Sequence, residues 1–210
     1  VFKTEAITLG RTDYSNSSQI ITFYTRDYGK INTIAKGFKR VSGRYSSKAI
    51  DLLTYYQILF IKKEYTSLHT LTEAVLQNNY PMLRNNLDNY YKASCMAELV
   101  NEFTEESDPS KQLFDIFLNT LNVISADTNA TIQLLTFEMK MLKILGYLPE
   151  LESCVNCKDS IQQVSEVHFN AREGGLLCKT CKVRFSNGII VPLGAALIAR
   201  RLVDINLQKL

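Results

Sequence analysis

The first 76 residues contain short runs in which apolar and polar positions alternate. Val, Ile, Thr, Tyr and Phe recur in these runs, and Gly, Asp and Ser interrupt them. This pattern is typical of β-strands separated by turns. It predicts five strands, near Lys3–Leu9, Gln19–Arg26, Lys30–Lys36, Leu52–Lys62 and Leu68–Leu76.

The links between these strands indicate a small barrel. Asp27-Tyr28-Gly29 is a hairpin signal between the second and third strands. The fourth strand is apolar on both faces, which indicates a closed or covered sheet. Five strands of this length suit a Greek-key barrel, and the OB-fold is the commonest such barrel that binds nucleic acid. An SH3-like barrel has a similar strand count, and the strand pattern alone does not separate the two.

From Tyr80 onward the apolar residues recur at helical spacing. The pattern predicts helices over Pro81–Thr104, from Asp108-Pro109 onward, over Thr131–Leu145 and over Pro192–Leu210. The last helix reaches the end of the sequence without a stop signal, so we expect the natural protein to continue.

The two patterns together predict an α+β fold with two domains. We expect an OB-fold β-barrel over residues 1–78, followed by an all-helical domain over residues 79–210. A cysteine-rich loop at about residues 150–190 is inserted before the last helix.

Four of the five cysteines form two C-x-x-C pairs, Cys154 with Cys157 and Cys178 with Cys181. One tight turn can present two sulfurs to one ion, and two such turns complete a tetrahedral zinc shell. The spacer of twenty residues suits a Cys-four zinc site. A closed shell leaves no position for a substrate, so we expect one structural zinc that holds the loop together.

Other uses of these cysteines fit less well. A thioredoxin-like redox site needs one C-x-x-C that opens a helix, and iron–sulfur clusters use tighter runs. His168 lies between the pairs and could replace a cysteine in a catalytic zinc site, but a lone histidine in a spacer is more often an ordinary residue. A zinc deaminase needs H-x-E and P-C-x-x-C, and neither motif occurs.

Charge is distributed unevenly around the net value of +3. Residues 1–75 hold 11 Lys and Arg against 6 Asp and Glu, whereas residues 76–150 hold 5 against 10. The basic first third is therefore the natural candidate for binding a polyanion.

The basic stretch between the third and fourth strands combines positive charge with aromatic residues. Single-stranded nucleic acid is bound by cations that contact phosphates and by aromatic rings that stack on bases. We expect this stretch to bind DNA, with two basic residues beside the hairpin extending the track. The candidates are Lys36, Phe38, Lys39, Arg40, Arg44, Tyr45 and Lys48 in the stretch, and Arg26 and Lys30 beside the hairpin.

Motifs for the common enzyme classes are absent from the sequence. There is no P-loop, no G-x-G-x-x-G and no G-x-S-x-G, and the two histidines, His69 and His168, are far apart. No apolar run is long enough to span a bilayer, and the N-terminus lacks the apolar core of a signal peptide. We therefore expect a cytoplasmic protein that is not an enzyme and that binds neither a membrane nor a small-molecule substrate.

The order of these parts resembles the RecO family of bacterial recombination mediators. The likeness is carried by TEAITLGRTDYSNSSQIITFYTRDYGKINTIAKGFKR, by MLKILGYLPELESCVNC and by FNAREGGLLCKTC. It covers nearly the whole chain. The resemblance implies an N-terminal OB-fold and a helical domain with zinc held by the four cysteines. It also implies a protein associated with the bacterial nucleoid.

The resemblance also implies a function and partners. Members bind single- and double-stranded DNA and anneal complementary strands. With RecR, and often RecF, they load RecA onto DNA coated by single-strand binding protein (SSB), and they have no ATPase or nuclease activity. Two alternatives stay open: a protein–protein adaptor that acts mainly through its helical domain, and an OB-fold module that binds RNA.

Overall fold

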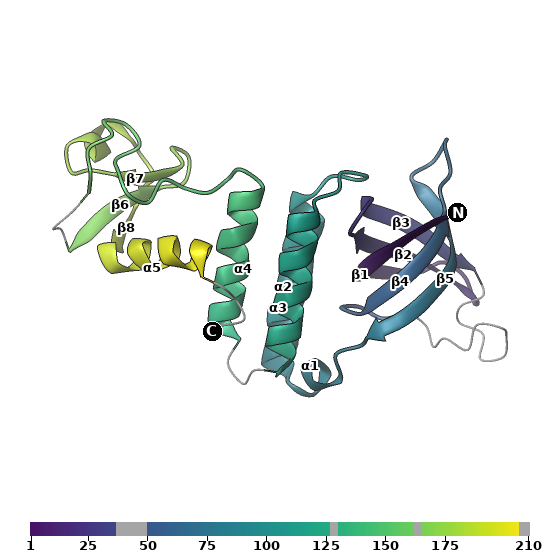
Figure 1. Ribbon diagram of the computed structural model, residues 1–210. Helices are drawn as coiled ribbons and strands as arrows, with labels where there is room; N and C mark the ends of the chain where they lie inside the picture. Colours follow the sequence, from purple (N-terminus) through teal and green to yellow (C-terminus); the bar gives the residue numbers. More distant parts are fainter. Residues whose placement is uncertain (37–49, 127–129, 162–164, 206–210) are drawn as a thin grey trace. The chain divides into compact units, whose positions relative to one another are not determined.

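The N-terminal part of the molecule is a closed barrel of five strands. The computed structural model describes residues 1–36, 50–126, 130–161 and 165–205. The strands are β1 (Phe2–Asp13), β2 (Ser18–Thr25), β3 (Gly29–Lys36), β4 (Tyr55–Ile61) and β5 (Leu68–Asn78). Their order around the barrel is β1-β2-β3-β5-β4, and β4 closes onto β1 (Figure 1).

Pairing between the strands identifies the barrel as OB-like. All neighbours are antiparallel except β3 and β5, which run parallel with Asn32 opposite Leu68. A register shift between Thr8 and Gly10 lets the long strand β1 bend and pair with both β2 and β4. The arrangement confirms the expected α+β fold class and the OB-like barrel, and it decides against the SH3-like alternative.

The barrel interior is filled by alternate residues of the five strands. Ile21, Phe23, Ile58 and Phe60 are almost completely buried there. These positions share one face of each strand because successive side chains point to opposite faces. Each such side chain contributes roughly 1.5–3 kcal/mol on full burial, so the barrel has a substantial core of its own.

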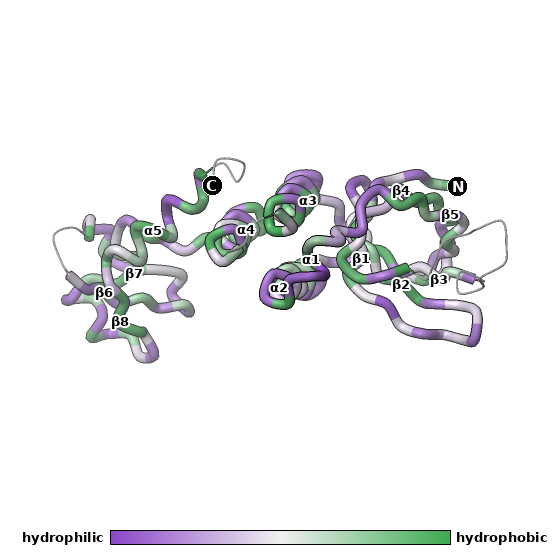
Figure 2. Tube along the Cα trace, turned by 90° about the horizontal axis from the view of Figure 1, so that it is seen from below, coloured by the Kyte–Doolittle hydropathy of each residue, from purple (hydrophilic) through white to green (hydrophobic). Residues whose placement is uncertain are grey.

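Three helices follow the barrel: α1 (Pro81–Asn85), α2 (Leu87–Phe103) and α3 (Lys111–Ala126). The Asn86 side chain accepts a hydrogen bond from the Asn89 backbone N–H and caps α2. The expected helix over Pro81–Thr104 is therefore two helices. Hydrophobic and hydrophilic positions alternate along α2 and α3 in Figure 2, and Leu113, Phe114, Phe117 and Leu121 form the buried stripe of α3.

The chain divides into two compact units, Val1–Leu134 and Leu135–Leu210. The first unit holds the barrel and α1 to α3. The division falls inside α4 (Thr131–Ile144). The domain boundary expected after residue 78 lies at the end of β5, within the first unit.

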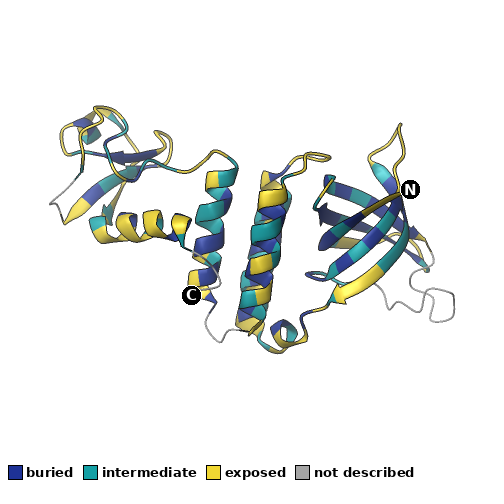
Figure 3. Cartoon of the chain, viewed as in Figure 1, coloured by how far each residue is buried: buried dark blue, intermediate teal, exposed yellow. Residues whose placement is uncertain are grey.

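The second unit contains a small sheet that the helical pattern did not predict. Its strands β6 (Glu166–Asn170), β7 (Gly175–Leu177) and β8 (Ile189–Pro192) are antiparallel in the order β7-β6-β8. A 3-10 turn, η1, spans Cys181–Arg184, and α5 (Leu193–Asp204) follows the sheet. Most positions of α5 are exposed (Figure 3).

No helix in the described part of the chain is both long and apolar enough to cross a membrane.

Candidate nucleic-acid interface and metal centre

The four cysteines of the C-x-x-C pairs come together in the second unit. Their sulfur atoms all lie within 4.8 Å of one another, and Cys157 Sγ is 3.8 Å from Cys178 Sγ. A tetrahedral zinc ion with Zn–S bonds of about 2.3 Å needs sulfurs about 3.8 Å apart. The four cysteines therefore form a group that could hold a metal ion, at the positions expected from their spacing.

The chemistry of this donor set fits a divalent cation. Burial disfavours the Cys154 thiolate, but hydrogen bonds from the backbone N–H groups of Cys157, Cys178 and Asn156 outweigh burial and lower the Cys154 pKa to about 6. The pKa of Cys157 is raised to about 12; the Asp159 N–H lowers it, but the Asp159 carboxylate and neighbouring thiols raise it more. Several thiolates this close repel one another, and a bound dication would remove that repulsion.

Short local contacts hold the two cysteine turns in place. The Cys181 N–H donates to Cys178 Sγ at 3.4 Å, and Asn156 Nδ2 donates to Cys181 Sγ at 3.2 Å. Cys154 and Cys181 are buried and pack with Leu177. The quartet is thus the centre of a small local core.

Gly175 allows β7 to approach the segment before the first cysteine turn. A Cβ at Gly175 would lie 2.4 Å from the Glu150 carbonyl oxygen. The Leu176 N–H donates to that same oxygen, and the Glu150 N–H donates to Gly174 O. This crossing of two backbones brings the two C-x-x-C turns together.

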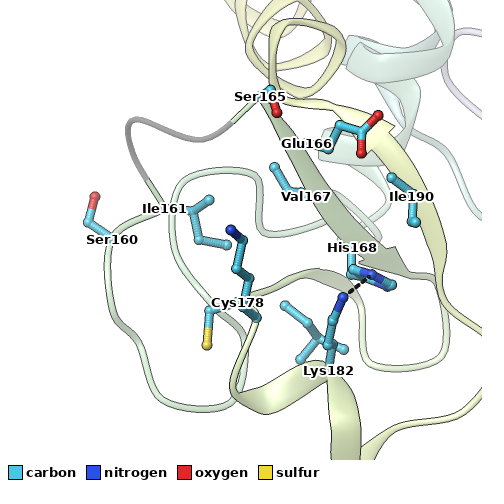
Figure 4. A pocket seen from close by; sticks show the side chains of 11 residues that line it. Ser160, Ile161, Ser165, Glu166, Val167, His168, Cys178, Lys182 and Ile190 are labelled. Atoms are coloured by element: carbon cyan, nitrogen blue, oxygen red, sulfur yellow. Dashed lines mark hydrogen bonds between the residues drawn. The ribbon is translucent and has the colours of Figure 1, made fainter.

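A pocket lies beside the quartet, with Cys178 in its wall (Figure 4). Its volume is about 460 Å³, and Ser165, His168 and Lys182 also line it. Lys182 Nζ lies 3.0 Å from His168 Nε2. Because an ammonium group can only donate, His168 Nε2 is the acceptor. His168 is thus bonded to a lysine and is not a member of the four-cysteine group.

The basic stretch predicted to bind DNA begins at Lys36, the exposed last residue of β3. The other members of the stretch lie outside the described residues: Phe38, Lys39, Arg40, Arg44, Tyr45 and Lys48. Their role in DNA binding stays a prediction. The structure places the start of the stretch at one end of β3, on the barrel surface.

The two hairpin residues of the predicted track have partners inside the first unit. Arg26 forms ion pairs with Glu5 at 2.8 Å and with Asp115 of α3 at 2.7 Å. The hydrogen bond to Glu5 and the nearby carboxylates raise the pKa of Arg26 further, although burial opposes them. Lys30 Nζ donates to Asn101 O at 2.5 Å. Contact of either residue with DNA stays a prediction, and it would compete with these interactions.

An acidic segment between α2 and α3, residues 105–108 with Glu105, Glu106 and Asp108, lies against the same part of β3. The Ser107 N–H donates to Lys30 O at 3.0 Å, and Glu106 accepts a hydrogen bond from Asn32 Nδ2 at 2.5 Å. A Cβ at Gly29 would lie 2.4 Å from Asp108 O, so only glycine permits this approach. The segment covers part of the β3 surface that an OB-fold commonly offers to nucleic acid.

The loop between β4 and β5 carries candidate residues that the sequence interpretation overlooked. Lys62, Lys63 and Tyr65 are exposed there. The signal was present as KKEY, two cations followed closely by an aromatic residue.

Comparison with known proteins gives the same family over both parts of the chain. The family model described as "Recombination protein O N terminal" matches residues 1–80. The model described as "Recombination protein O C terminal" matches residues 84–210. Together they cover the barrel, the helices and the cysteine quartet.

Similar curated proteins carry one name. The chain is 30% identical over 210 residues to "DNA repair protein RecO" of Syntrophus aciditrophicus, which covers 99% of this chain and 81% of that protein. It is 35% identical over 181 residues to "DNA repair protein RecO" of Bacillus pumilus (86% and 68%) and 33% identical over 179 residues to that of Bacillus subtilis (85% and 68%).

Proposed function

The chain belongs to the RecO family of DNA repair proteins, and from that premise we propose that it is a non-enzymatic DNA-binding mediator of recombination. It binds single- and double-stranded DNA through the barrel and anneals complementary strands. With RecR, and with RecF where present, it helps RecA replace SSB on single-stranded DNA.

The observation that carries this proposal is the closed OB-like barrel with a basic stretch at the end of β3. Lys36 begins the stretch at the barrel surface. Between Lys36 and Lys48 there are five cations and no acid. Such a stretch suits an ionic contact with a polyphosphate backbone, and that contact weakens steeply as salt rises.

For the cysteine quartet we propose one structural zinc ion. Zinc is supported by the four-thiolate donor set, by the sulfur spacing and by the two C-x-x-C turns. The four cysteines Cys154, Cys157, Cys178 and Cys181 would hold it. In this role zinc stabilises the fold of the second unit and takes no part in strand annealing.

Annealing of complementary oligonucleotides tests the proposed function directly. We expect the protein to accelerate annealing at low salt, measured by the approach of fluorescent labels on the two strands. Acceleration should fall as the salt concentration rises, because the release of counterions into a more concentrated salt solution is less favourable. If the protein fails to accelerate annealing at about 50 mM salt, the proposed function is wrong. RNA oligonucleotides run in parallel distinguish a DNA mediator from an RNA-binding module.

A variant of the basic stretch tests whether this stretch binds DNA. Lys39→Ala, Arg40→Ala and Arg44→Ala together should weaken DNA binding and reduce the slope of log affinity against log salt by about 2, since each lost phosphate contact on single strands accounts for about 0.7. Unchanged affinity and slope in the triple variant would place the DNA interface elsewhere on the molecule.

A further inference from the structure

The loop between β4 and β5, residues 62–67, projects from the barrel at the end where the N-terminus lies (Figure 1). Lys62 and Lys63 open the loop, and Tyr65 follows with 97% of its surface exposed. Burial of an aromatic ring from water is favourable, so a tyrosine this exposed has apolar surface available for a partner.

The cations of this loop are available as well. Among the described residues, neither Lys62 nor Lys63 takes part in an ion pair, and the loop holds one acid, Glu64. Two other cations of the first unit, in contrast, are engaged in ion pairs. Arg11 pairs with Asp51, and Arg26 pairs with Glu5 and Asp115.

The loop and Lys36 both adjoin β3, so one strand of DNA bound along the barrel can contact the loop and the start of the basic stretch. Leu68, which ends the loop, pairs with Asn32 of β3. Lys36 lies four residues further along β3, about 13 Å at the usual rise of a strand. Because β3 and β5 run parallel, the loop lies beyond Asn32 toward Lys30, whereas Lys36 lies at the other end of β3. An oligonucleotide that contacts both the loop and Lys36 must therefore span the length of β3.

The acidic segment limits where DNA can lie on the outer face of β3. Glu106 and the Ser107 backbone occupy Asn32 and Lys30 on the outer face of β3. A phosphate at these positions would meet a carboxylate. The exposed β4–β5 loop is therefore more accessible to DNA than the covered part of the face at Lys30 and Asn32.

We propose that the β4–β5 loop is a second contact for single-stranded DNA, in which Tyr65 stacks on a base and Lys62 and Lys63 contact the flanking phosphates. This inference rests on the proposed function. It adds a stacking site to the basic stretch that begins at Lys36.

The absence of tryptophan from the chain allows a direct test. In Tyr65→Trp the single indole reports on the loop, and its fluorescence should be quenched when oligo(dT) is added. The matched control is Tyr91→Trp on α2, since Tyr91 is 63% exposed and lies away from the loop in sequence. Binding is followed independently by the anisotropy of a labelled oligonucleotide.

Further variants separate the contribution of base stacking by Tyr65 from that of the charges on Lys62 and Lys63. Tyr65→Ala should weaken binding about 5- to 150-fold, the equivalent of one stacked base, whereas Tyr65→Phe should bind as the unaltered chain does. Lys62→Ala with Lys63→Ala should reduce the salt slope by about 1.4. Lys111→Ala with Arg172→Ala lowers the net charge equally and should leave the slope unchanged.

The outcomes distinguish this inference from the function on which it rests. If the unaltered chain does not bind the oligonucleotide, both are wrong. If it binds while the indole of Tyr65→Trp stays unquenched and Tyr65→Ala keeps full affinity, the loop assignment alone is wrong. Quenching of Tyr91→Trp to the same extent would also overturn the assignment, because the effect would not be local.

Discussion

The barrel and the cysteine unit are stabilised in different ways. In the barrel, five strands pair in a closed ring around apolar side chains such as Phe23 and Ile58. In the second unit the sheet has three short strands, and its apolar cluster has few fully buried members, among them Leu176 and Val167. A region with so small a core needs another source of stability, and the metal ion proposed for the four cysteines would provide it.

This difference implies that the barrel and the second unit are stabilised independently, which can be tested. The barrel should keep its fold and its DNA affinity when the second unit is perturbed. The second unit should depend on metal more than on any single apolar side chain.

The largest effect is expected from loss of the metal. A chelator, or Cys154→Ser, should abolish the ordered structure around β6, β7 and η1, because structural zinc contributes about 10–16 kcal/mol to folding in zinc-finger peptides. Hydrogen exchange should become fast over residues 150–190 and stay slow in β1 to β5. Elemental analysis of the untreated protein should find about one zinc ion per chain.

Cys95→Ser is the matched control for loss of a thiol, since Cys95 lies on α2 and outside the quartet. It should keep both the metal and the slow exchange of the second unit. If the barrel loses protection together with the second unit on chelation, the two regions are not independent and the comparison fails.

An intermediate effect is expected at Gly29, where the barrel meets the acidic segment. Gly29→Ala places a Cβ 2.4 Å from Asp108 O at φ +65°. Left-handed strain and overpacking should together cost about 2–4 kcal/mol of unfolding free energy, measured by urea denaturation. The zinc content should not change, because the four cysteines proposed to hold the metal lie in the other unit.

Gly194→Ala provides the contrast in the second unit. No atom lies within 4 Å of the added Cβ, and Gly194 sits in the first turn of α5. Replacement of glycine by alanine in a helix should stabilise by up to about 1 kcal/mol. Equal effects at Gly29 and Gly194 would contradict the close approach described for the hairpin.

The smallest effect is expected from the buried histidine of the barrel. Burial lowers the pKa of His69 below its usual 6.5, Lys62 and Lys63 lower it further, and Glu106 opposes them. The neutral ring stacks on Phe60 and its Nδ1 accepts from the Lys63 N–H. Because the folded state resists protonation, stability is full above about pH 6.5 and falls as the pH drops from there toward the lower folded pKa.

Hydrogen exchange of β4 and β5 between pH 7.5 and 5.5, corrected for the intrinsic rate, measures this effect. His69→Phe keeps an aromatic ring beside Phe60 and removes the titrating group, so its barrel should lose less stability on acidification. An identical pH dependence in the unaltered chain and the variant would exclude His69 as the cause.

The sequence predicted the barrel strands to within a few residues because their signals are local. Alternation marks the strands, and Asp27-Tyr28-Gly29 marks the hairpin. The cysteine quartet was equally predictable from the sequence, since C-x-x-C spacing is a local signal for a turn of the kind that binds metal.

What the sequence did not predict depends on contacts between distant residues. Lys30 and Asn101 are 71 positions apart, and nothing near Lys30 indicates that a carbonyl at a helix end will accept a hydrogen bond from its ammonium group. Strands β6 to β8 are only three to five residues long, too short for a clear period, and they form by pairing with one another.

The open edge of the small sheet affects how the protein should be handled. Strand β8 pairs with β6 alone among the described strands, and Ile189 and Ile190 are 61% and 59% exposed. A closed barrel has no edge to which another chain can add a strand, whereas an Ile-Ile-Val edge can recruit one. Pro192, which lacks an N–H, limits this edge at its end. We therefore expect aggregation during purification to begin at β8, and chelating buffers to promote it.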